Sequence, residues 1–271
     1  MAGHLMADGH TLRVFTRTRS KADPLLEKGA AWCASPAEAV QHAEVVCTML
    51  GYPEDVREVY FGEQGVFSAV PDGAVLIDFT TSSPSLAREI AAKAAEKGLG
   101  SVDAPVSGGD TGARQAALSI MLGGETADVD RVRSLLERLG KNVVHQGPAG
   151  SGQMTKLCNQ IAIASNMLGV CEALVFARAG GLDPNRVLQS IEHGAAGSWS
   201  LSNLAPRILD GDLDPGFFVH HFIKDMSMAL ETAIEENLEL PGLELALNRY
   251  RLLARQGGEH LGTQGLIRLY E

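Results

Sequence analysis

The stretch Gln146-Gly-Pro-Ala-Gly-Ser-Gly152 divides the chain into two halves of different pattern. Three glycines and a proline within seven residues indicate a loop, because these residues interrupt helices and strands. After the loop, apolar residues recur at helical spacing from Met154 to about Ala179, and no strand pattern follows. Before it, short apolar runs alternate with segments of helical spacing. We therefore expect an α/β domain over residues 1–148 and an all-helical domain over residues 149–271.

The first half follows a strand–helix–strand rhythm, which predicts βαβ units and a largely parallel sheet. Its expected strands are Thr11–Thr16, Val45–Met49, Ala74–Asp78, Gly100–Ala104, Leu118–Leu122 and Asn142–His145. Its expected helices are Pro36–Gln41, Pro53–Tyr60, Ser85–Lys97 and Ala127–Arg138.

In the second half, the stretch from Met154 to Ala179 is apolar on most sides, but polar residues such as Lys156 and Asn166 interrupt it. This pattern favours a long helix buried between neighbours over a membrane helix. Further helices are expected at Pro184–Glu192, Leu201–Leu209, Phe222–Glu236 and Leu243–Gln256.

The composition narrows the class of protein. The chain has 271 residues, with 33 acidic against 23 basic side chains and a formal charge of −10. An acidic surface argues against nucleic-acid binding, which needs surplus positive charge. No apolar run is long enough to span a bilayer, and the first ten residues do not form a secretory leader. The cysteines show no metal-ligand spacing and indicate reduced, mostly buried thiols of a cytoplasmic protein; they are Cys33, Cys47, Cys158 and Cys171.

A basic cluster follows the first expected strand, and within it Arg17 and Arg19 lie just past the strand end. In a dinucleotide-binding sheet this place contacts the adenosine ribose, where an arginine suits a 2′-phosphate. The alternative is a solvated basic turn, because runs of charge commonly lie on solvated faces.

A second candidate site is Asp103-Ala-Pro-Val-Ser-Gly-Gly109. Gly108 and Gly109 allow backbone N–H groups to approach an anion closely, and Ser107 adds a hydroxyl donor. The loop therefore suits a carboxylate, although a glycine-rich turn without a ligand would show the same pattern.

A third candidate is Lys156, which lies in the early turns of the long helix. The positive end of the helix dipole and partial burial both disfavour the ammonium form, so this lysine could act as a base. Asn159 and Gln160 follow at i+3 and i+4 and can share its face. The alternative is a surface lysine whose stem lies along apolar neighbours.

Taken in order, these motifs resemble those of the β-hydroxyacid dehydrogenases, the 3-hydroxyisobutyrate dehydrogenase-like group, over essentially the whole chain. The family's DxSTxxP stretch is present at Asp78–Pro84, with Thr at the Ser position. Its DxPVSGG loop is intact at Asp103–Gly109, and its GxGxxxK motif is intact at Gly150–Lys156. Its late lysine–aspartate pair is Lys224-Asp225.

The resemblance implies a Rossmann-type domain, followed by a helical substrate and oligomerisation domain, and hydride exchange between a nicotinamide cofactor and a small 3-hydroxy acid or its semialdehyde or keto acid. Lys156 would be the general acid–base, and Arg17 favours NADP over NAD. The residues that match substrate positions are Ser107, Gly108, Gly109 and Asn159. Those that match cofactor positions are Arg17, Met49, Leu50, Thr81 and Lys224. The family usually forms dimers or tetramers, so a homodimer or homotetramer is expected.

Two departures from the family pattern matter. The segment Met1–Met6 resembles the middle of the family's first helix, so the first strand and its Gly-x-Gly-x-x-Gly turn are not in this chain. We therefore expect the 271-residue chain to bind cofactor poorly and an upstream-extended chain to be active, which NADPH fluorescence titration of both would test. Asn159 and Gln160 also leave open which side chain contacts the substrate.

Other readings of the same fold remain. A non-catalytic protein for cofactor sensing or oligomerisation, or an inactive fragment, would explain the missing turn, but an intact Lys156 argues against it. The 6-phosphogluconate dehydrogenases carry His where this chain has Asn159, and imine reductases generally replace the lysine.

Overall fold

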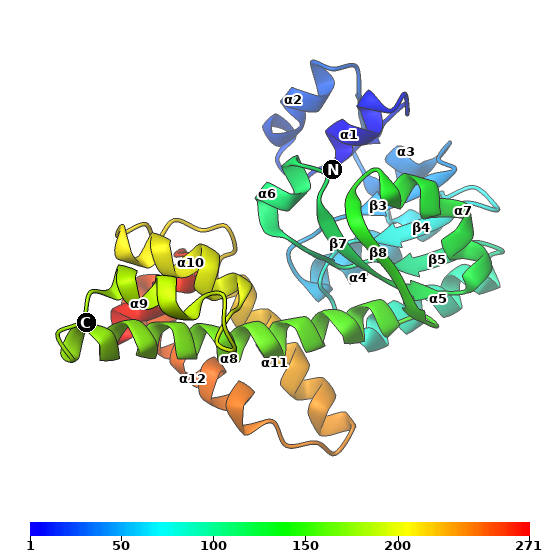
Figure 1. Ribbon diagram of the computed structural model, residues 1–271. Coiled ribbons are helices and arrows are strands. Elements are labelled where there is room, and N and C mark those ends of the chain that lie inside the picture. Colours follow the sequence, from blue (N-terminus) through cyan, green and yellow to red (C-terminus); the bar gives the residue numbers. More distant parts are fainter. The chain divides into compact units, whose positions relative to one another are not determined.

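The computed structural model describes residues 1–271, which fall into two compact units, Met1–Lys156 and Leu157–Glu271. The first unit carries all the strands, and the second is built from helices (Figure 1). The division lies inside helix α8 (Ser151–Ala179), which begins in the first unit and continues through the second.

The first unit is built on a six-stranded sheet. Strands β3, β4 and β5 are parallel neighbours, and β7 pairs in parallel with β8. However, β7 is antiparallel to β5 and β6, so the expected parallel sheet is mixed on this side. The strands, in their spatial order, are β3 (Val45–Thr48), β4 (Val75–Asp78), β5 (Gly100–Asp103), β7 (Leu118–Gly124) and β6 (Val106–Ser107), with β8 (Gly140–Gly147) beside β7.

A second, two-stranded sheet holds β1 (Arg13–Val14) and β2 (Ala31–Trp32), which pair in parallel. No strand joins β1 to β3, so β3 is an edge strand of the larger sheet. The first half therefore contains two sheets rather than one.

Helices cover both faces of the larger sheet. On strand β4, Val75 and Ile77 belong to one core cluster and Leu76 to the other, because successive strand residues point to opposite faces. Helix α7 packs on the first face, and α4 and α5 pack on the second. The helices of this unit are α1 (Ala2–Ala7), α2 (Asp23–Leu26), α3 (Pro36–Val40), α4 (Pro53–Phe61), α5 (Pro84–Glu96), α6 (Gly109–Arg114) and α7 (Thr126–Glu137), with short 3₁₀ turns at Arg19–Ala22 and Val66–Ser68.

The second unit packs its helices around one apolar core in which Met167, Phe222 and Tyr250 are fully buried. The Tyr250 hydroxyl donates to the Thr263 carbonyl at 2.8 Å, so this buried polar group is satisfied. Besides α8, the helices are α9 (Pro184–Ile191), α10 (Trp199–Leu209), α11 (Val219–Glu235) and α12 (Pro241–Leu253), followed by short helical turns at Ala254–Gly258 and Thr263–Leu269.

Helix α8 is long and apolar enough, by length and composition, to cross a membrane, but only 39% of its most apolar window is buried. One face, with Leu157, Met167 and Leu174, lies in the core of the second unit. Ala162 and Phe176 lie on the exposed face. The helix is thus a core helix of its unit, with one side that the rest of this single chain leaves uncovered.

The cysteines also differ from expectation. Cys33 and Cys171 are buried, but Cys47 on the edge strand β3 and Cys158 on α8 are exposed, and all four are free. Burial nevertheless raises the pKa of the Cys47 thiol to about 12, so Cys158 is the clearest departure from the expectation.

Candidate functional site

The carboxyl ends of three neighbouring strands meet at one edge of the larger sheet. Thr48, Asp78 and Asp103 end strands β3, β4 and β5, and they are direct partners in the ladder. Ligands of open α/β sheets bind beyond such strand ends. The loops that follow these strands, together with the loop before α8, hold most of the sequence motifs.

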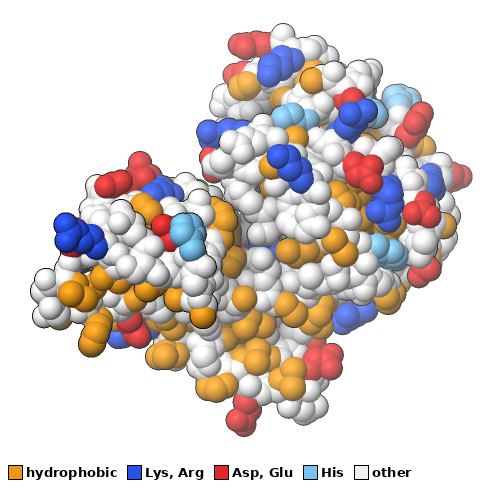
Figure 2. Space-filling model, in the orientation of Figure 1, with side chains coloured by type: hydrophobic (Ala, Val, Ile, Leu, Met, Phe, Trp, Pro, Cys, Tyr) orange, Lys and Arg blue, Asp and Glu red, His pale blue; other side chains and the backbone are white.

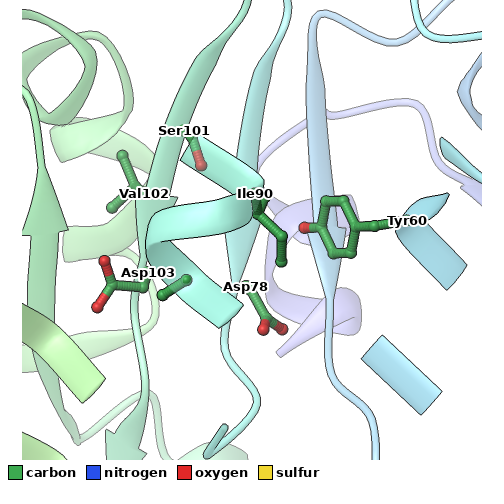
Figure 3. Close-up of a pocket in the computed structure, with 7 residues that line it drawn as sticks. Tyr60, Asp78, Ile90, Ser101, Val102 and Asp103 are labelled. Atoms are coloured by element: carbon green, nitrogen blue, oxygen red, sulfur yellow. The ribbon is translucent and has the colours of Figure 1, made fainter. Parts of the chain in front are cut away.

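Asp78 is the buried centre of this edge. The Thr48 hydroxyl donates to Asp78 Oδ1 at 2.8 Å, and the Thr80 backbone N–H donates to the same oxygen at 3.1 Å. The Tyr60 hydroxyl lies 3.1 Å from Thr48 Oγ1 and is the donor there, because Thr48 has already given its only proton. Tyr60, Asp78 and Asp103 line a cavity of about 10 Å³, which has room for one water molecule; Figure 3 shows these residues.

Burial raises the pKa of Asp78 to about 6, although the Thr80 and Thr48 hydrogen bonds oppose the shift. The nearby Asp103 carboxylate raises it further. Two carboxyl groups on adjacent strands, both shielded from water, therefore resist ionising together.

Thr80 connects the loops after β3 and β4. Its hydroxyl oxygen accepts the Leu50 backbone N–H at 2.9 Å. Met49, beside Leu50, is 59% exposed, and Thr81 is half-buried. The three residues that match cofactor positions in these loops, Met49, Leu50 and Thr81, are thus brought together at one edge of the sheet.

Asp103 holds the beginning of helix α8. Its carboxylate accepts the backbone N–H groups of Gly150 at 2.7 Å and Gln153 at 2.8 Å. Burial raises the pKa of Asp103 despite these bonds, which favour the charged form. A Cβ on Gly152 would meet the carbonyl oxygens of Met121 and Asp103, the latter at 2.7 Å. The glycine is therefore needed for the helix to approach the sheet this closely.

Lys156 is the sixth residue of α8 and is only 7% exposed. The alternative of a surface lysine is wrong, since the side chain is buried near the positive end of the helix.

The Ser107-Gly108-Gly109 turn lies four residues beyond Asp103 in the chain. Ser107 pairs with Ser119 of β7, and Gly108 and Gly109 begin helix α6 with φ angles of +126° and +61°. These angles favour glycine at both positions. The short helix α6 was not expected, because glycines disfavour helices.

Arg17 follows β1 with its side chain 78% exposed, and its Nη1 lies 2.9 Å from Asp55 Oδ1. Asp55 is in the first turn of α4. The guanidinium is thus held in place by one acid while most of its surface faces solvent.

In the second unit, Asn159 Nδ2 donates to Gln160 Oε1 at 2.7 Å, and Gln160 Nε2 donates to Asp225 Oδ2 at 2.6 Å. Lys224 Nζ lies 3.1 Å from Asp225 Oδ1. Gln160 is buried with both ends of its amide bonded, whereas Asn159 is half-buried. Gln160 therefore links two elements of the unit, and Asn159 is the more accessible of the pair.

Sequence reasoning missed Gln153, Thr80 and the buried role of Asp78. All three are polar residues with almost no exposure. The only sequence signal was their position inside motifs that were assigned to neighbouring residues.

Comparison with known proteins agrees with these features. Residues 1–147 match the family model of the NAD-binding domain of 6-phosphogluconate dehydrogenase. Residues 150–270 match that of the NAD-binding domain of NADP-dependent 3-hydroxyisobutyrate dehydrogenase.

Two relatives are similar over almost the whole chain. An uncharacterised oxidoreductase of Bacillus subtilis, YkwC, is 53% identical over 100% of this chain and 94% of its own length. A probable 3-hydroxyisobutyrate dehydrogenase-like protein of Arabidopsis thaliana is 47% identical over 98% of this chain and 80% of its own length.

A solved structure of Mycobacterium tuberculosis 3-hydroxyisobutyrate dehydrogenase with L-serine has a TM-score of 0.91 and 30% identity, covering 99% of this chain and 93% of that one. The fold, the motifs and the relatives agree: the chain belongs to the β-hydroxyacid dehydrogenase family and is an NAD(P)-dependent hydroxyacid dehydrogenase.

Proposed function

We propose that this chain exchanges a hydride between NADP(H) and a small 3-hydroxy acid, or the matching semialdehyde or keto acid, with Lys156 as general acid–base. The observation that carries the proposal is a buried lysine near the start of α8. The start of that helix is held by Asp103, which belongs to the same segment as the Ser107-Gly108-Gly109 turn. The segment Asp103–Gly109 thus contains the turn that would bind the substrate carboxylate. It also contains the aspartate that holds the start of the helix carrying Lys156.

The described residues fit a nicotinamide dinucleotide. The loops after parallel strands β3 and β4 are tied together by Thr80 and present the exposed Met49 beside Leu50 and Thr81. The exposed guanidinium of Arg17 offers donors to a 2′-phosphate, which favours NADP over NAD. Lys224 is the further cofactor residue implied by the family pattern.

During oxidation, Lys156 in its neutral form would accept the hydroxyl proton of the substrate at Nζ while the carbinol C–H leaves as hydride. In the reverse direction the ammonium would return that proton to the carbonyl oxygen. The Ser107 hydroxyl and the backbone N–H groups of Gly108 and Gly109 would hold the substrate carboxylate, with Asn159 as a further contact. The cofactor, when bound, supplies the acceptor or donor of the hydride.

The substrate class is narrowed by two further relatives. One is named NAD-dependent L-serine dehydrogenase, at 35% identity, and the other 2-hydroxy-3-oxopropionate reductase, at 36% identity. Both names, like 3-hydroxyisobutyrate, describe a carboxylate with oxygen on its third carbon. We therefore propose a short 3-oxygenated carboxylic acid as substrate.

The experiment is a panel of L-serine, 3-hydroxyisobutyrate and 2-hydroxy-3-oxopropionate with NADP(H) and NAD(H), run on the wild type, Lys156→Ala and Lys93→Ala. Lys93 is an exposed lysine of α5 paired with Glu96, so it controls for the loss of one lysine. We expect Lys156→Ala to lower kcat at least ~100-fold and Lys93→Ala to leave it unchanged. Near-normal turnover of Lys156→Ala would rule out the assigned role. No turnover by the wild type, with NADPH still bound, would favour a cofactor-sensing protein.

We also propose that the chain forms a homodimer or homotetramer through its helical unit. Large apolar side chains lie exposed on this unit, and hydrophobic side chains gather in the lower part of the view in Figure 2. Phe176 on the uncovered side of α8 is 81% exposed, and Trp199, Ile234 and Leu238 are also exposed. Light scattering should report more than one chain per particle, and Phe176→Glu should lower that number.

A further inference from the structure

We propose that Gln153 is a positioning residue that locks the start of α8, and with it Lys156, to the loop Thr80–Ser82. The inference rests on the proposed role of Lys156 as acid–base. It adds a residue that would touch neither substrate nor cofactor and would act by fixing the groups that do.

Gln153 makes three hydrogen bonds to other segments of the first unit. Its side-chain Nε2 donates to the Thr80 carbonyl at 2.8 Å, and its Oε1 accepts the Ser82 backbone N–H at 2.9 Å. Its own backbone N–H donates to Asp103 Oδ2 at 2.8 Å. The side chain is fully buried. The amide thus bonds to the backbone on both sides of Thr81, the residue that matches a cofactor contact.

An amide of this length matches both backbone groups at any pH, whereas a carboxyl group matches them only when it is protonated. The Thr80 carbonyl needs a donor and the Ser82 N–H needs an acceptor, and a carboxylate would supply two acceptors. Because the site is buried, an unmatched partner could not form its hydrogen bond with water instead, and the folded state would be less stable. Replacing this glutamine with an apolar side chain would therefore leave two buried backbone groups without these hydrogen bonds.

The same connection reaches two functional segments. Thr80 also accepts the Leu50 N–H through its hydroxyl oxygen, so the loop after β3 joins the loop that Gln153 holds. Lys156 lies three residues after Gln153, on a neighbouring face of the same helix. Gln153 therefore sets where the lysine lies relative to both loops that carry candidate cofactor contacts.

The proposal predicts a kinetic defect beyond loss of stability. Without the two hydrogen bonds of the Gln153 amide, Lys156 and the loop Thr80–Ser82 can shift independently. A misplacement of about 1 Å can lower the rate about 100-fold. We expect Gln153→Ala to lower kcat about 10- to 100-fold and to raise the primary isotope effect from cofactor deuterated at the transferred hydrogen, since hydride transfer becomes rate-limiting. A purely structural role would lower the amount of folded enzyme without changing the isotope effect.

The conservative variant Gln153→Glu tests the donor directly. When protonated, its carboxyl can donate to the Thr80 carbonyl and accept from Ser82; when ionised, it cannot donate. Burial favours the neutral form. The kcat of Gln153→Glu relative to wild type, measured for NADPH with 2-hydroxy-3-oxopropionate, should rise as the pH falls, whereas that of Gln153→Ala should not.

One control variant and one further measurement complete the test. Gln264, in the second unit, is also a buried glutamine, and its Nε2 donates to backbone carbonyls. Gln264→Ala therefore removes a buried amide, as Gln153→Ala does, but at a site far from Lys156 in the sequence. Its isotope effect should equal that of wild type. In the cofactor-free protein, hydrogen exchange of the peptide over Thr80–Ser82 should speed up in Gln153→Ala and not in Gln264→Ala.

The outcomes separate the two proposals. A wild-type isotope effect, kcat and exchange rate in Gln153→Ala, with Lys156→Ala inactive, would overturn the positioning role alone. An active Lys156→Ala would overturn the acid–base assignment on which that role rests.

Discussion

Replacing Asp78 with asparagine should make this protein's stability less sensitive to pH between about pH 5 and pH 7.5. The carboxyl is buried at the end of β4, where it accepts bonds from the Thr48 hydroxyl and the Thr80 N–H. Asparagine keeps an oxygen for both bonds but carries no charge, so the change removes the titration while it preserves the acceptor.

The sign follows from the direction of the shift. Burial raises the pKa of Asp78 from its usual 3.8 to about 6, so between these values the folded chain binds a proton that the unfolded chain has lost. The stabilisation linked to this proton is fully present below pH 3.8 and is lost as the pH rises through about 6. The whole effect is roughly 3 kcal/mol, and roughly 1 kcal/mol of it falls between about pH 5 and pH 7.5.

The assay is urea unfolding of the wild type and of Asp78→Asn at both pH values. The variant's free energy of unfolding relative to wild type should rise by roughly 1 kcal/mol from the lower to the higher pH. Comparing two chains largely cancels the titrating groups that do not interact with Asp78. Asp130→Asn, at an exposed position of α7, controls for the removal of one surface charge. An unchanged or decreasing relative stability of Asp78→Asn would refute the reasoning.

Three further outcomes are expected. Arg17→Asp should shift the ratio of kcat/KM values for NADP and NAD toward NAD, and an unchanged ratio would reject Arg17 as the 2′-phosphate contact. Tyr250→Phe should lower the free energy of unfolding by about 1–3 kcal/mol in urea titrations, because the buried Thr263 carbonyl loses its donor. A thiol reagent should label exposed Cys158 quickly in the native protein and leave Cys171 intact, because burial raises the pKa of the Cys171 thiol to about 12; equal labelling rates would contradict the burial.

The sequence by itself predicted most elements of both units. The expected strand Ala74–Asp78 is β4 (Val75–Asp78), and the expected helix Ser85–Lys97 is α5 (Pro84–Glu96). These succeed because periodicity and capping are local. Ser83 accepts the Leu86 N–H at the start of α5, and Gly98 follows its end with φ +67°. The motifs around Lys156 likewise predicted the family, because a motif consists of residue types at a fixed spacing and the sequence gives both directly.

Tertiary structure decided what depends on pairing between distant residues. The antiparallel placement of β6, the separation of β1 from β3, and the uncovered side of α8 each arise from which surfaces meet, and no local pattern records that. The same holds for Gln153, whose partners Thr80 and Ser82 lie 73 and 71 residues away in the chain. A buried amide is acceptable only where a folded backbone offers it both a donor and an acceptor, so its role exists only in three dimensions.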